Sequence, residues 1–227
     1  MGSQGPILFF DDGVCSSTKN RLDIKTDHHH CKQPGWNELK VSKEKNAENR
    51  ASLVGAAADL FARRGVEGTG VAEIAKSAGL TQGALYAHFS SKQELVAAAL
   101  QFALGRANTA MAQLAARSGL EGLTQYYLSS EHCADVSGGC AMAAAASELS
   151  RQDKDVSQQL LSGFSELVEV VARGLDADPA EARRTAIGII ASLIGAVSLA
   201  RGVSKADEDL ASEILSSVKQ YVGRSKG

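Results

Sequence analysis

The chain has 227 residues, of which 44% are hydrophobic, and its formal net charge is −2. This length allows one large domain or two small ones, and the apolar share allows a sizeable core. Residues 1–15 lack the basic start and long apolar run of a signal peptide, and no stretch holds the roughly 20 apolar residues that cross a bilayer. We therefore expect no membrane association, and a cytoplasmic protein whose four cysteines are reduced.

The composition favours helix. Alanine, the strongest helix former, is abundant, and aromatic residues make up only 5% of the chain. Proline, which disrupts a helix by removing a backbone donor, occurs only at Pro6, Pro34 and Pro179. The sequence therefore predicts an all-α protein.

The charges are unevenly divided along the chain. Residues 40–106 carry nine Lys and Arg against six Asp and Glu, a net +3, whereas residues 107–227 carry eleven against fifteen, a net −4. A basic segment on an acidic body is typical of a nucleic-acid-binding module attached to a second domain. An ordinary solvated surface is the alternative interpretation of the +3.

The first 40 residues show no helical period, and they contain the run DHHHC at Asp27–Cys31. This run resembles the signature of membrane acyltransferases, but those enzymes need transmembrane helices. Its possible zinc ligands are adjacent, whereas a structural site usually uses separated pairs. We therefore expect no metal site and no cofactor. We interpret residues 1–42 as an extension that is disordered or not part of the native protein.

A first amphipathic helix is predicted from Asn46 to Gly65. Its apolar residues follow the spacing i, i+4, i+7, i+8, and Gly65 ends it. Thr69 is a suitable cap for a second helix over residues 71–78, and residues 79–81, Gly-Leu-Thr, predict a tight turn. The apolar stripe of the first helix consists of Leu53, Ala57, Leu60 and Phe61.

A very short third helix is predicted over residues 82–88. Leu85 and Phe89 lie four positions apart, so both fall on one side and point toward the core. Ser91 and Glu94 then match a capping box, in which the serine caps a fourth helix and the glutamate reaches back to the cap. Helix, glycine turn and short helix in this order make a helix-turn-helix arrangement.

Three motifs lie within residues 47–96: Ala-x-x-Leu-Phe-x-x-x-Gly, then Ile-Ala-x-x-Ala-Gly-Leu, then Gly-Ala-Leu-Tyr-x-His-Phe-x-Ser-Lys-x-x-Leu. With them the segment resembles the DNA-binding domain of the TetR family of bacterial transcriptional regulators, although Gly70 departs from the family pattern. The resemblance implies a three-helix helix-turn-helix DNA-binding domain at residues 43–92, with a linking helix to about residue 106. A larger helical domain for effector binding and dimerisation would then occupy residues 107–227.

The predicted third helix has a slim first turn, because Gly83 and Ala84 have minimal side chains. Such a helix start can enter the major groove and approach base edges. Tyr86 and His88 on the flanks can reach phosphates, and Lys92 adds a positive charge beside the free N–H groups of the fourth helix. By resemblance the contact positions are Thr69, Thr81, Gln82, Ala84, Tyr86, His88 and Lys92, to which we add Gly83 for close backbone approach and Arg50 as a further candidate.

Residues 107–227 are predicted to form further helices. A glycine pair at residues 138–139 breaks the chain between two of them. Asp178 is a suitable cap for a helix that begins at Pro179, the favoured arrangement. The predicted helices span residues 120–130, 140–150, 156–175, 179–201 and 205–222.

The segment from Ala186 to Ala200 is apolar on all sides, and such a helix must be covered on every side. Gly188, Ser192 and Ala196 recur every four residues and would let a partner helix approach closely. We infer a homodimer interface here, with a central core helix as the alternative. The resemblance implies the same, because TetR-type dimers pair their last two long helices in a four-helix bundle. A two-fold dimer in turn predicts a palindromic operator.

The middle helices are expected to enclose a ligand pocket. A small molecule that prefers the form with the wrong separation of recognition helices lowers the affinity for double-stranded DNA. The leading interpretation is therefore a repressor that a small-molecule effector releases from its operator. The candidate lining residues are Phe102, Met111, Tyr126, Tyr127, His132, Met142 and Phe164.

Two cysteines, Cys133 and Cys140, are candidates for sensing electrophiles or oxidants. Cys140 follows the glycine pair at a predicted helix start, a position that favours the reactive thiolate, and Cys133 lies beside His132. The alternative is that both are small buried apolar residues.

Other functions fit the sequence less well. An enzyme with Cys133 or Cys140 as nucleophile and His132 as base would lack an orienting third residue, so we expect no enzyme. A DNA-binding protein without a ligand does not need the helical body of residues 107–227. A transcriptional activator remains an alternative, because a repressor is favoured only by what is usual for the family that the sequence resembles.

Overall fold

A computed structural model describes the backbone of residues 36–224 and the side chains of residues 42–144 and 148–224. All regular elements in this part of the chain are helices, which confirms the all-α prediction. The run DHHHC, Cys15 and Cys31 lie outside the described residues. The helices are α1 (Trp36–Arg64), α2 (Val71–Ser77), α3 (Gln82–His88), α4 (Lys92–Tyr127), α5 (Ser130–Ala134), α6 (Ala141–Leu149), α7 (Lys154–Ala172), α8 (Pro179–Val203) and α9 (Glu208–Arg224).

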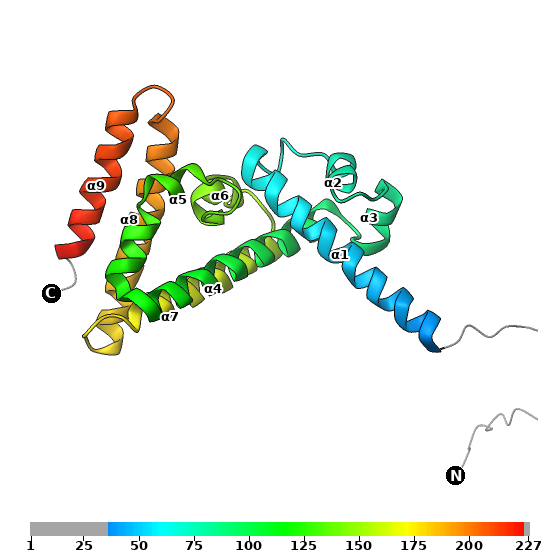
Figure 1. The fold of residues 1–227 in the computed structure, drawn as a ribbon, viewed down its shortest axis with the longest axis horizontal. Coiled ribbons are helices and arrows are strands. Elements are labelled where there is room, and N and C mark those ends of the chain that lie inside the picture. The colour runs from blue at the N-terminus through cyan, green and yellow to red at the C-terminus, as the bar shows by residue number, and fades with distance from the viewer. Residues whose placement is uncertain (1–35, 225–227) are drawn as a thin grey trace, which may run out of the picture.

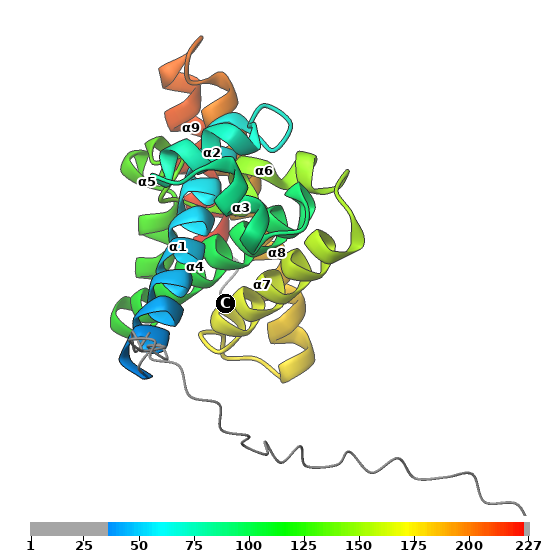
Figure 2. The same ribbon diagram turned by 90° about the vertical axis from the view of Figure 1, so that its right-hand side faces the viewer.

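The helices form two lobes joined by α4 (Figure 1). The smaller lobe holds α1, α2 and α3. From there α4 runs along α7 into the larger lobe, in the most extensive contact between any two of these helices. At the far end α8 and α9 pack together, while α6 contacts α1, α4 and α8 (Figures 1 and 2). This is a helix-turn-helix domain followed by a larger helical domain.

A continuous apolar core holds α1, α2 and α3 against α4. The stripe predicted on α1 faces this core, with Leu60 half-buried and its other members buried. Each buried Leu or Phe side chain contributes about 1.5–3 kcal/mol to folding, so the short α2 and α3 depend on tertiary packing. The buried side chains that meet here are Leu53, Ala57, Phe61, Ile74, Ala75, Leu85, Phe89, Leu95 and Ala99.

Three glycines end or break helices because they adopt positive φ, a region that other residues enter only with strain. Gly65 (φ +76°) follows the last residue of α1, as predicted, and Gly79 (φ +71°) lies in the turn before α3. Gly119 (φ +64°) interrupts α4, so the separate helix predicted from residue 120 is a continuation beyond this break.

Two helix starts differ from the sequence expectation. α1 begins at Trp36 rather than near Asn46, so the end of the segment assigned to the N-terminal extension is helical. α2 is capped by Gly70, which has no capping side chain, rather than by Thr69. The Thr69 hydroxyl donates instead to the Gly65 carbonyl at 2.8 Å, so it stabilises the turn between the helices.

The start of α8 is as predicted. The Asp178 carboxylate accepts hydrogen bonds from the backbone N–H groups of Ala180 and Glu181 at 3.0 and 3.2 Å, and Pro179 is the first helical residue. Contrary to our expectation, α8 is long and apolar enough to cross a membrane by those two criteria, alone among the helices described. Eight of its residues are buried in the core, which accounts for the apolar composition without a bilayer.

Replacement of Phe89 with alanine should destabilise the fold strongly. The ring is 1% exposed, and loss of a buried aromatic ring leaves a cavity that costs about 3–5 kcal/mol. Chemical denaturation followed by circular dichroism measures the free energy of unfolding. Leu161→Ala is the control, because this side chain is 65% exposed and its loss should cost about 0.5 kcal/mol or less. Equal losses in the two variants would contradict the packing role of Phe89.

Candidate nucleic-acid interface and effector cavity

One face of α3 is buried and the opposite face is open. Leu85 and Phe89, the pair predicted to point inward, are 0% and 1% exposed. Tyr86 on the other side is 50% exposed. The open face therefore carries the side chains that the sequence assigned to DNA. Its exposed residues at the helix start are Thr81, Gln82 and Gly83.

Thr81 fixes the first turn of α3. Its hydroxyl accepts a hydrogen bond from the backbone N–H of Ala84 at 3.1 Å, as an N-cap does. The hydroxyl also remains exposed at the open face. This cap keeps the slim start of the helix ordered before any ligand arrives.

The start of α4 is a modified capping box. The Ser91 hydroxyl accepts from the Glu94 backbone N–H at 3.1 Å, as predicted. The Glu94 carboxylate reaches one residue further than expected, to the backbone N–H and the hydroxyl of Ser90, at 2.7 and 2.8 Å. These hydrogen bonds favour the charged form and hold the pKa of Glu94 below its ordinary value.

Lys92 has a structural partner that the sequence did not reveal. Its ammonium donates to the Val66 carbonyl at 2.6 Å, and the side chain is half-buried. This bond ties the start of α4 to the loop after α1, near the open face of α3. An ammonium has three donors, so the bond to Val66 leaves others for a phosphate.

Arg50 and His88 flank the same surface. The guanidinium of Arg50 lies 4.9 Å from the centroid of the Phe89 ring, a cation–π distance, and the residue is exposed. The His88 ring is half-buried and its centroid is 6.5 Å from that of Phe89. Phe89 therefore orients a positive group of α1 beside the end of α3.

Thr69 does not belong to this surface. Its side chain is 1% exposed, and its hydroxyl is already bonded to the Gly65 carbonyl. A buried, satisfied hydroxyl cannot reach a phosphate without unfolding the turn, so we remove Thr69 from the predicted contacts. The other eight predicted positions are exposed or half-buried.

A cavity of about 320 Å³ lies in the larger lobe, between the α4–α5 region, the loop before α6, and α7. It brings together five of the seven predicted pocket residues. Phe102 is not among them because it is 45% exposed beside the Arg106 guanidinium, and Phe164 packs half-buried against the core. The lining residues are Leu104, Arg106, Ala107, Asn108, Ala110, Met111, Tyr126, Tyr127, His132, Gly138, Gly139, Cys140, Met142 and Leu167.

Asn108 is a cavity residue that the sequence reasoning missed. It is 6% exposed, and its amide donates to the Gly163 carbonyl at 2.8 Å and to the Glu166 carboxylate at 3.2 Å. Its spacing could have revealed it, because it lies four residues after Leu104 and three before Met111 on the apolar face of α4. These bonds fix α4 against α7 at the cavity wall.

The aromatic end of the cavity holds buried polar atoms. The ring centroid of His132 lies 4.7 Å from that of Tyr127 and 5.2 Å from that of Tyr126. Among the described residues, neither the Tyr127 hydroxyl nor the Nε2 of His132 has a hydrogen-bond partner, and both atoms are buried. Burial lowers the pKa of His132, and the charge of Arg201 lowers it further, so the ring is neutral at neutral pH.

Comparison with known proteins identifies the smaller lobe. Residues 53–99 match the family model described as bacterial regulatory proteins, tetR family. Residues 53–99 therefore form a DNA-binding domain of the TetR type. The TetR regulator TtgR of Pseudomonas putida is 49% identical over 62 residues, which cover 27% of this chain and 30% of TtgR. The chain thus matches less than a third of the length of this relative.

Two further relatives come from Mycolicibacterium smegmatis. The repressor KstR2 is 48% identical over 50 residues, covering 22% of this chain and 24% of KstR2. The activator FasR is 40% identical over 70 residues, covering 31% and 32%. A solved TetR structure from Chloroflexus aurantiacus has a TM-score of 0.64 at 25% identity and covers 80% of this chain and 97% of its own. The TetR fold therefore extends through the larger lobe.

The loop between α5 and α6 joins the two lobes. Arg63 of α1 donates to the Ser137 hydroxyl at 2.8 Å, and Arg106 of α4 donates to the Ser137 carbonyl at 2.9 Å. The Glu148 carboxylate of α6 accepts from the backbone N–H of Glu67, just after α1, at 2.9 Å. Movement of this loop or of α6 would therefore change the contacts that hold the DNA-binding domain.

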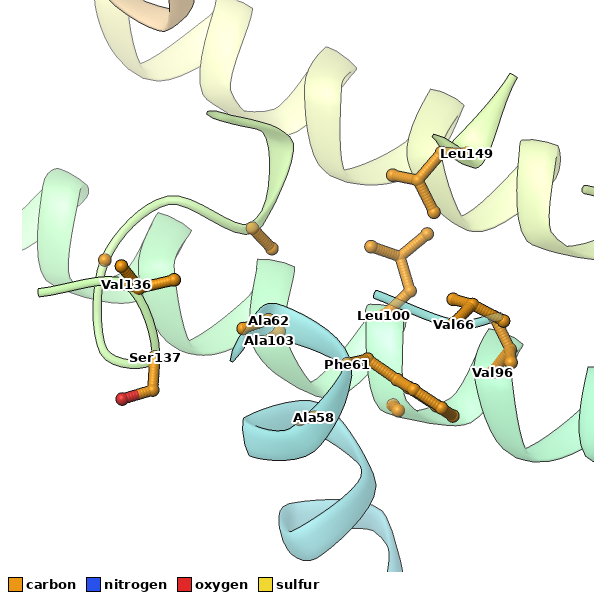
Figure 3. Close-up of a pocket in the computed structure, with 13 residues that line it drawn as sticks. Ala58, Phe61, Ala62, Val66, Val96, Leu100, Ala103, Val136, Ser137 and Leu149 are labelled. Atoms are coloured by element: carbon orange, nitrogen blue, oxygen red, sulfur yellow. The ribbon is translucent and has the colours of Figure 1, made fainter. Parts of the chain in front are cut away.

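Apolar side chains complete the junction between the lobes (Figure 3). Phe61 of α1, Leu100 of α4 and Leu149 of α6 surround a small space of about 40 Å³. Gly139 borders both this space and the 320 Å³ cavity. The two cavities thus share a wall made by the α5–α6 loop.

The two candidate cysteines differ in position. Cys140 is 4% exposed, lines the larger cavity and is the N-cap of α6, as its predicted place at a helix start requires. Cys133 is half-buried, and its carbonyl accepts from Arg201 at 2.8 Å. Both are free thiols. Among the side chains described, those of residues 42–144 and 148–224, no group of three His, Cys, Asp or Glu could hold a metal ion.

The neutral state of His132 predicts a pH dependence of stability. The ordinary pKa is 6.5 and burial lowers it in the folded protein, so as the pH falls below 6.5 the unfolded state binds more protons. The free energy of unfolding should therefore fall as the pH drops from about 7.5 to about 5.5. In the His132→Gln variant, the free energy of unfolding, measured by chemical denaturation at several pH values, should fall less steeply over this range. Equal slopes for the two proteins would contradict a buried neutral His132.

Proposed function

We propose that the protein is a DNA-binding transcriptional repressor, and that a small-molecule effector releases its homodimer from a palindromic operator. The observation that carries this proposal is the open face of α3, held outward by the burial of Leu85 and Phe89. A recognition helix must expose its polar side to DNA while its apolar side packs against the rest of its domain. Such a protein acts in the cytoplasm.

The proposed contacts divide by chemistry. Gln82, with the small Gly83 and Ala84 beside it, approaches base edges in the major groove. Tyr86 and Lys92 contact phosphates on the flanks and set the register. The remaining phosphate contacts are proposed for Thr81, His88 and Arg50.

The dimer interface is proposed on α8 and α9. Ala196, assigned to this interface from the sequence, is instead buried in the protomer at 3% exposure. Steps of four residues rotate around a helix by about 40° each, so such a stripe drifts off one face, whereas alternating steps of four and three stay on it. The corrected stripe on α8 is Gly188, Ser192, Gly195, Leu199 and Gly202.

This corrected stripe suits close approach by a second copy. An added Cβ at Gly188, Gly195 or Gly202 would meet no atom within 4 Å. Leu199 is 61% exposed, a large value for a leucine on an otherwise apolar helix. On α9, Leu210 and Tyr221 are 41% and 64% exposed. A partner protomer would cover this apolar surface and place two recognition helices about one DNA turn, ~34–36 Å, apart.

Replacement of Lys92 with alanine should weaken DNA binding equally for all sequences. One lost phosphate contact lowers the slope of log affinity against log salt by about one. Fluorescence anisotropy at several salt concentrations, with duplexes enriched by the protein from a random pool, measures both quantities. Lys205→Ala removes the same charge from an exposed site in the larger lobe and serves as control. An unchanged salt slope in Lys92→Ala would remove Lys92 from the contacts.

Replacement of Leu199 with arginine should separate the protomers. The charge would be buried without a partner at the dimer contact, which is strongly unfavourable. Sedimentation equilibrium should then report the monomer mass, with DNA affinity reduced at least tenfold. Leu161→Arg, an equally exposed position on α7, should remain dimeric. A dimeric Leu199→Arg protein would place the interface elsewhere.

The direction of regulation has its own test. KstR2 is a repressor and FasR an activator, so both outcomes occur among the similar proteins. A reporter gene behind the enriched operator should be transcribed less when the protein is present. Increased transcription would replace the repressor by an activator and leave the DNA-binding proposal intact.

A further inference from the structure

Cys140 occupies an unusual position in the cavity wall. Its side chain is 4% exposed, and it lines the 320 Å³ cavity together with Met111 and Leu167. Cys140 is also the N-cap residue of α6, and its side chain makes no capping hydrogen bond. Anions are favoured at a helix start, so a thiolate is better tolerated here than elsewhere in an apolar wall.

A second observation points to chemistry at this thiol. The Tyr127 side chain is 3% exposed and its hydroxyl is buried without a hydrogen-bond partner among the described residues. Tyr127 and Cys140 line the same cavity. A buried hydroxyl without a partner is costly, and a thiolate beside it would accept its proton in a hydrogen bond. Burial, followed by the nearby thiol, raises the pKa of Tyr127, so the hydroxyl stays a donor at neutral pH.

We propose that the effector is a small, apolar, soft electrophile, such as an α,β-unsaturated carbonyl compound, which Cys140 captures covalently inside the cavity. This inference rests on the proposed function and names the chemical class of its effector. Cys133 is not the reactive thiol in this proposal, because it does not line the cavity. The mostly apolar lining would select compounds without charge.

The addition is balanced and needs no oxidant or reductant. The Cys140 thiol gives up its proton, and the sulfur forms a bond to the β-carbon of the alkene. The π electrons of the carbon–carbon double bond move onto the carbonyl as an enolate. The α-carbon then takes up one proton, which replaces the proton that the thiol released, so the addition neither consumes nor releases a proton overall. The product is a thioether, and the Tyr127 hydroxyl stabilises the thiolate that attacks.

The adduct would act on DNA binding through α6. Cys140 is the N-cap of this helix, and the backbone just before it is closely packed, because an added Cβ at Gly139 would lie 2.4 Å from the Asp135 carbonyl oxygen. The far end of α6 carries Glu148, which binds the Glu67 backbone N–H, and Leu149, which packs against the junction shown in Figure 3. In this proposal the adduct shifts the start of α6, and the contacts at the far end of the helix carry the shift to the DNA-binding domain.

N-ethylmaleimide is a suitable probe, because it is small, neutral and alkylates thiols by the same addition. The full-length protein, bound to its enriched duplex, is treated with it, and tryptic peptides are analysed by mass spectrometry while anisotropy reports release. We expect an adduct on Cys140 and at least a tenfold loss of DNA affinity in the wild type and in Cys133→Ser. Cys140→Ser should keep its DNA, and Tyr127→Phe should react several-fold more slowly at Cys140. A maleimide linked to polyethylene glycol, too large for the cavity, should leave Cys140 unmodified.

Each remaining outcome overturns the proposal. Adducts on other cysteines with Cys140 unmodified would show that the thiol is not reachable, and a modified Cys140 with DNA still bound would show that it does not regulate. Release of Cys140→Ser by the probe would also contradict it, and Cys140→Ala replaces this variant if the serine protein does not fold. Failure of the untreated protein to bind any duplex is a different result, because it refutes the proposed function while the mass of Cys140 is still measured.

Discussion

Leu85 and Phe89 hold α3 in place, and the direction of the recognition surface depends on this contact. A seven-residue helix has too few backbone hydrogen bonds to persist alone in water. Its order comes from two side chains that are almost fully buried against neighbouring helices. Because these side chains occupy one face, Gln82 and Tyr86 are left on the other, where a duplex can reach them.

In the larger lobe, too, long helices hold short elements in place. α5 and α6 are short, and the loop between them is gripped by arginines from three long helices: Arg63, Arg106 and Arg201. That loop is a wall of the cavity and of the junction between lobes. In the proposed function, a ligand changes the DNA-binding domain without touching it, by shifting this well-connected segment.

Local patterns in the sequence predicted the features that depend on neighbours along the chain. Spacing alone predicted that Leu85 and Phe89, four positions apart, are buried together, and the structure confirms it. The dipeptide Asp178-Pro179 likewise predicted the start of α8. Lys92 could not be placed in the same way, because its partner is a carbonyl 26 residues away. The order of three motifs identified the DNA-binding domain for a related reason: every one of them is local.

Predictions that required knowing which face of a helix is covered were less successful. Phe102 and Phe164 are apolar residues on helices, like the true cavity residues, and only the packing of α4 and α7 decides which side chains face the cavity. The sequence around Thr69 is typical of an N-cap. In the folded turn, however, the Thr69 hydroxyl donates to the Gly65 carbonyl instead. Ala196 was assigned to the interface stripe on α8 by a period of four, which leaves one face of a helix, and the residue is buried in the protomer.

Hydrogen–deuterium exchange with and without DNA tests the central claim most directly. The backbone of residues 81–92, from the cap of α3 to the start of α4, should exchange more slowly when the protein is bound to an enriched duplex at low ionic strength. Exchange in this segment that is unchanged by DNA, with protection elsewhere on the protein, would contradict the assignment of α3 as the element that enters the groove.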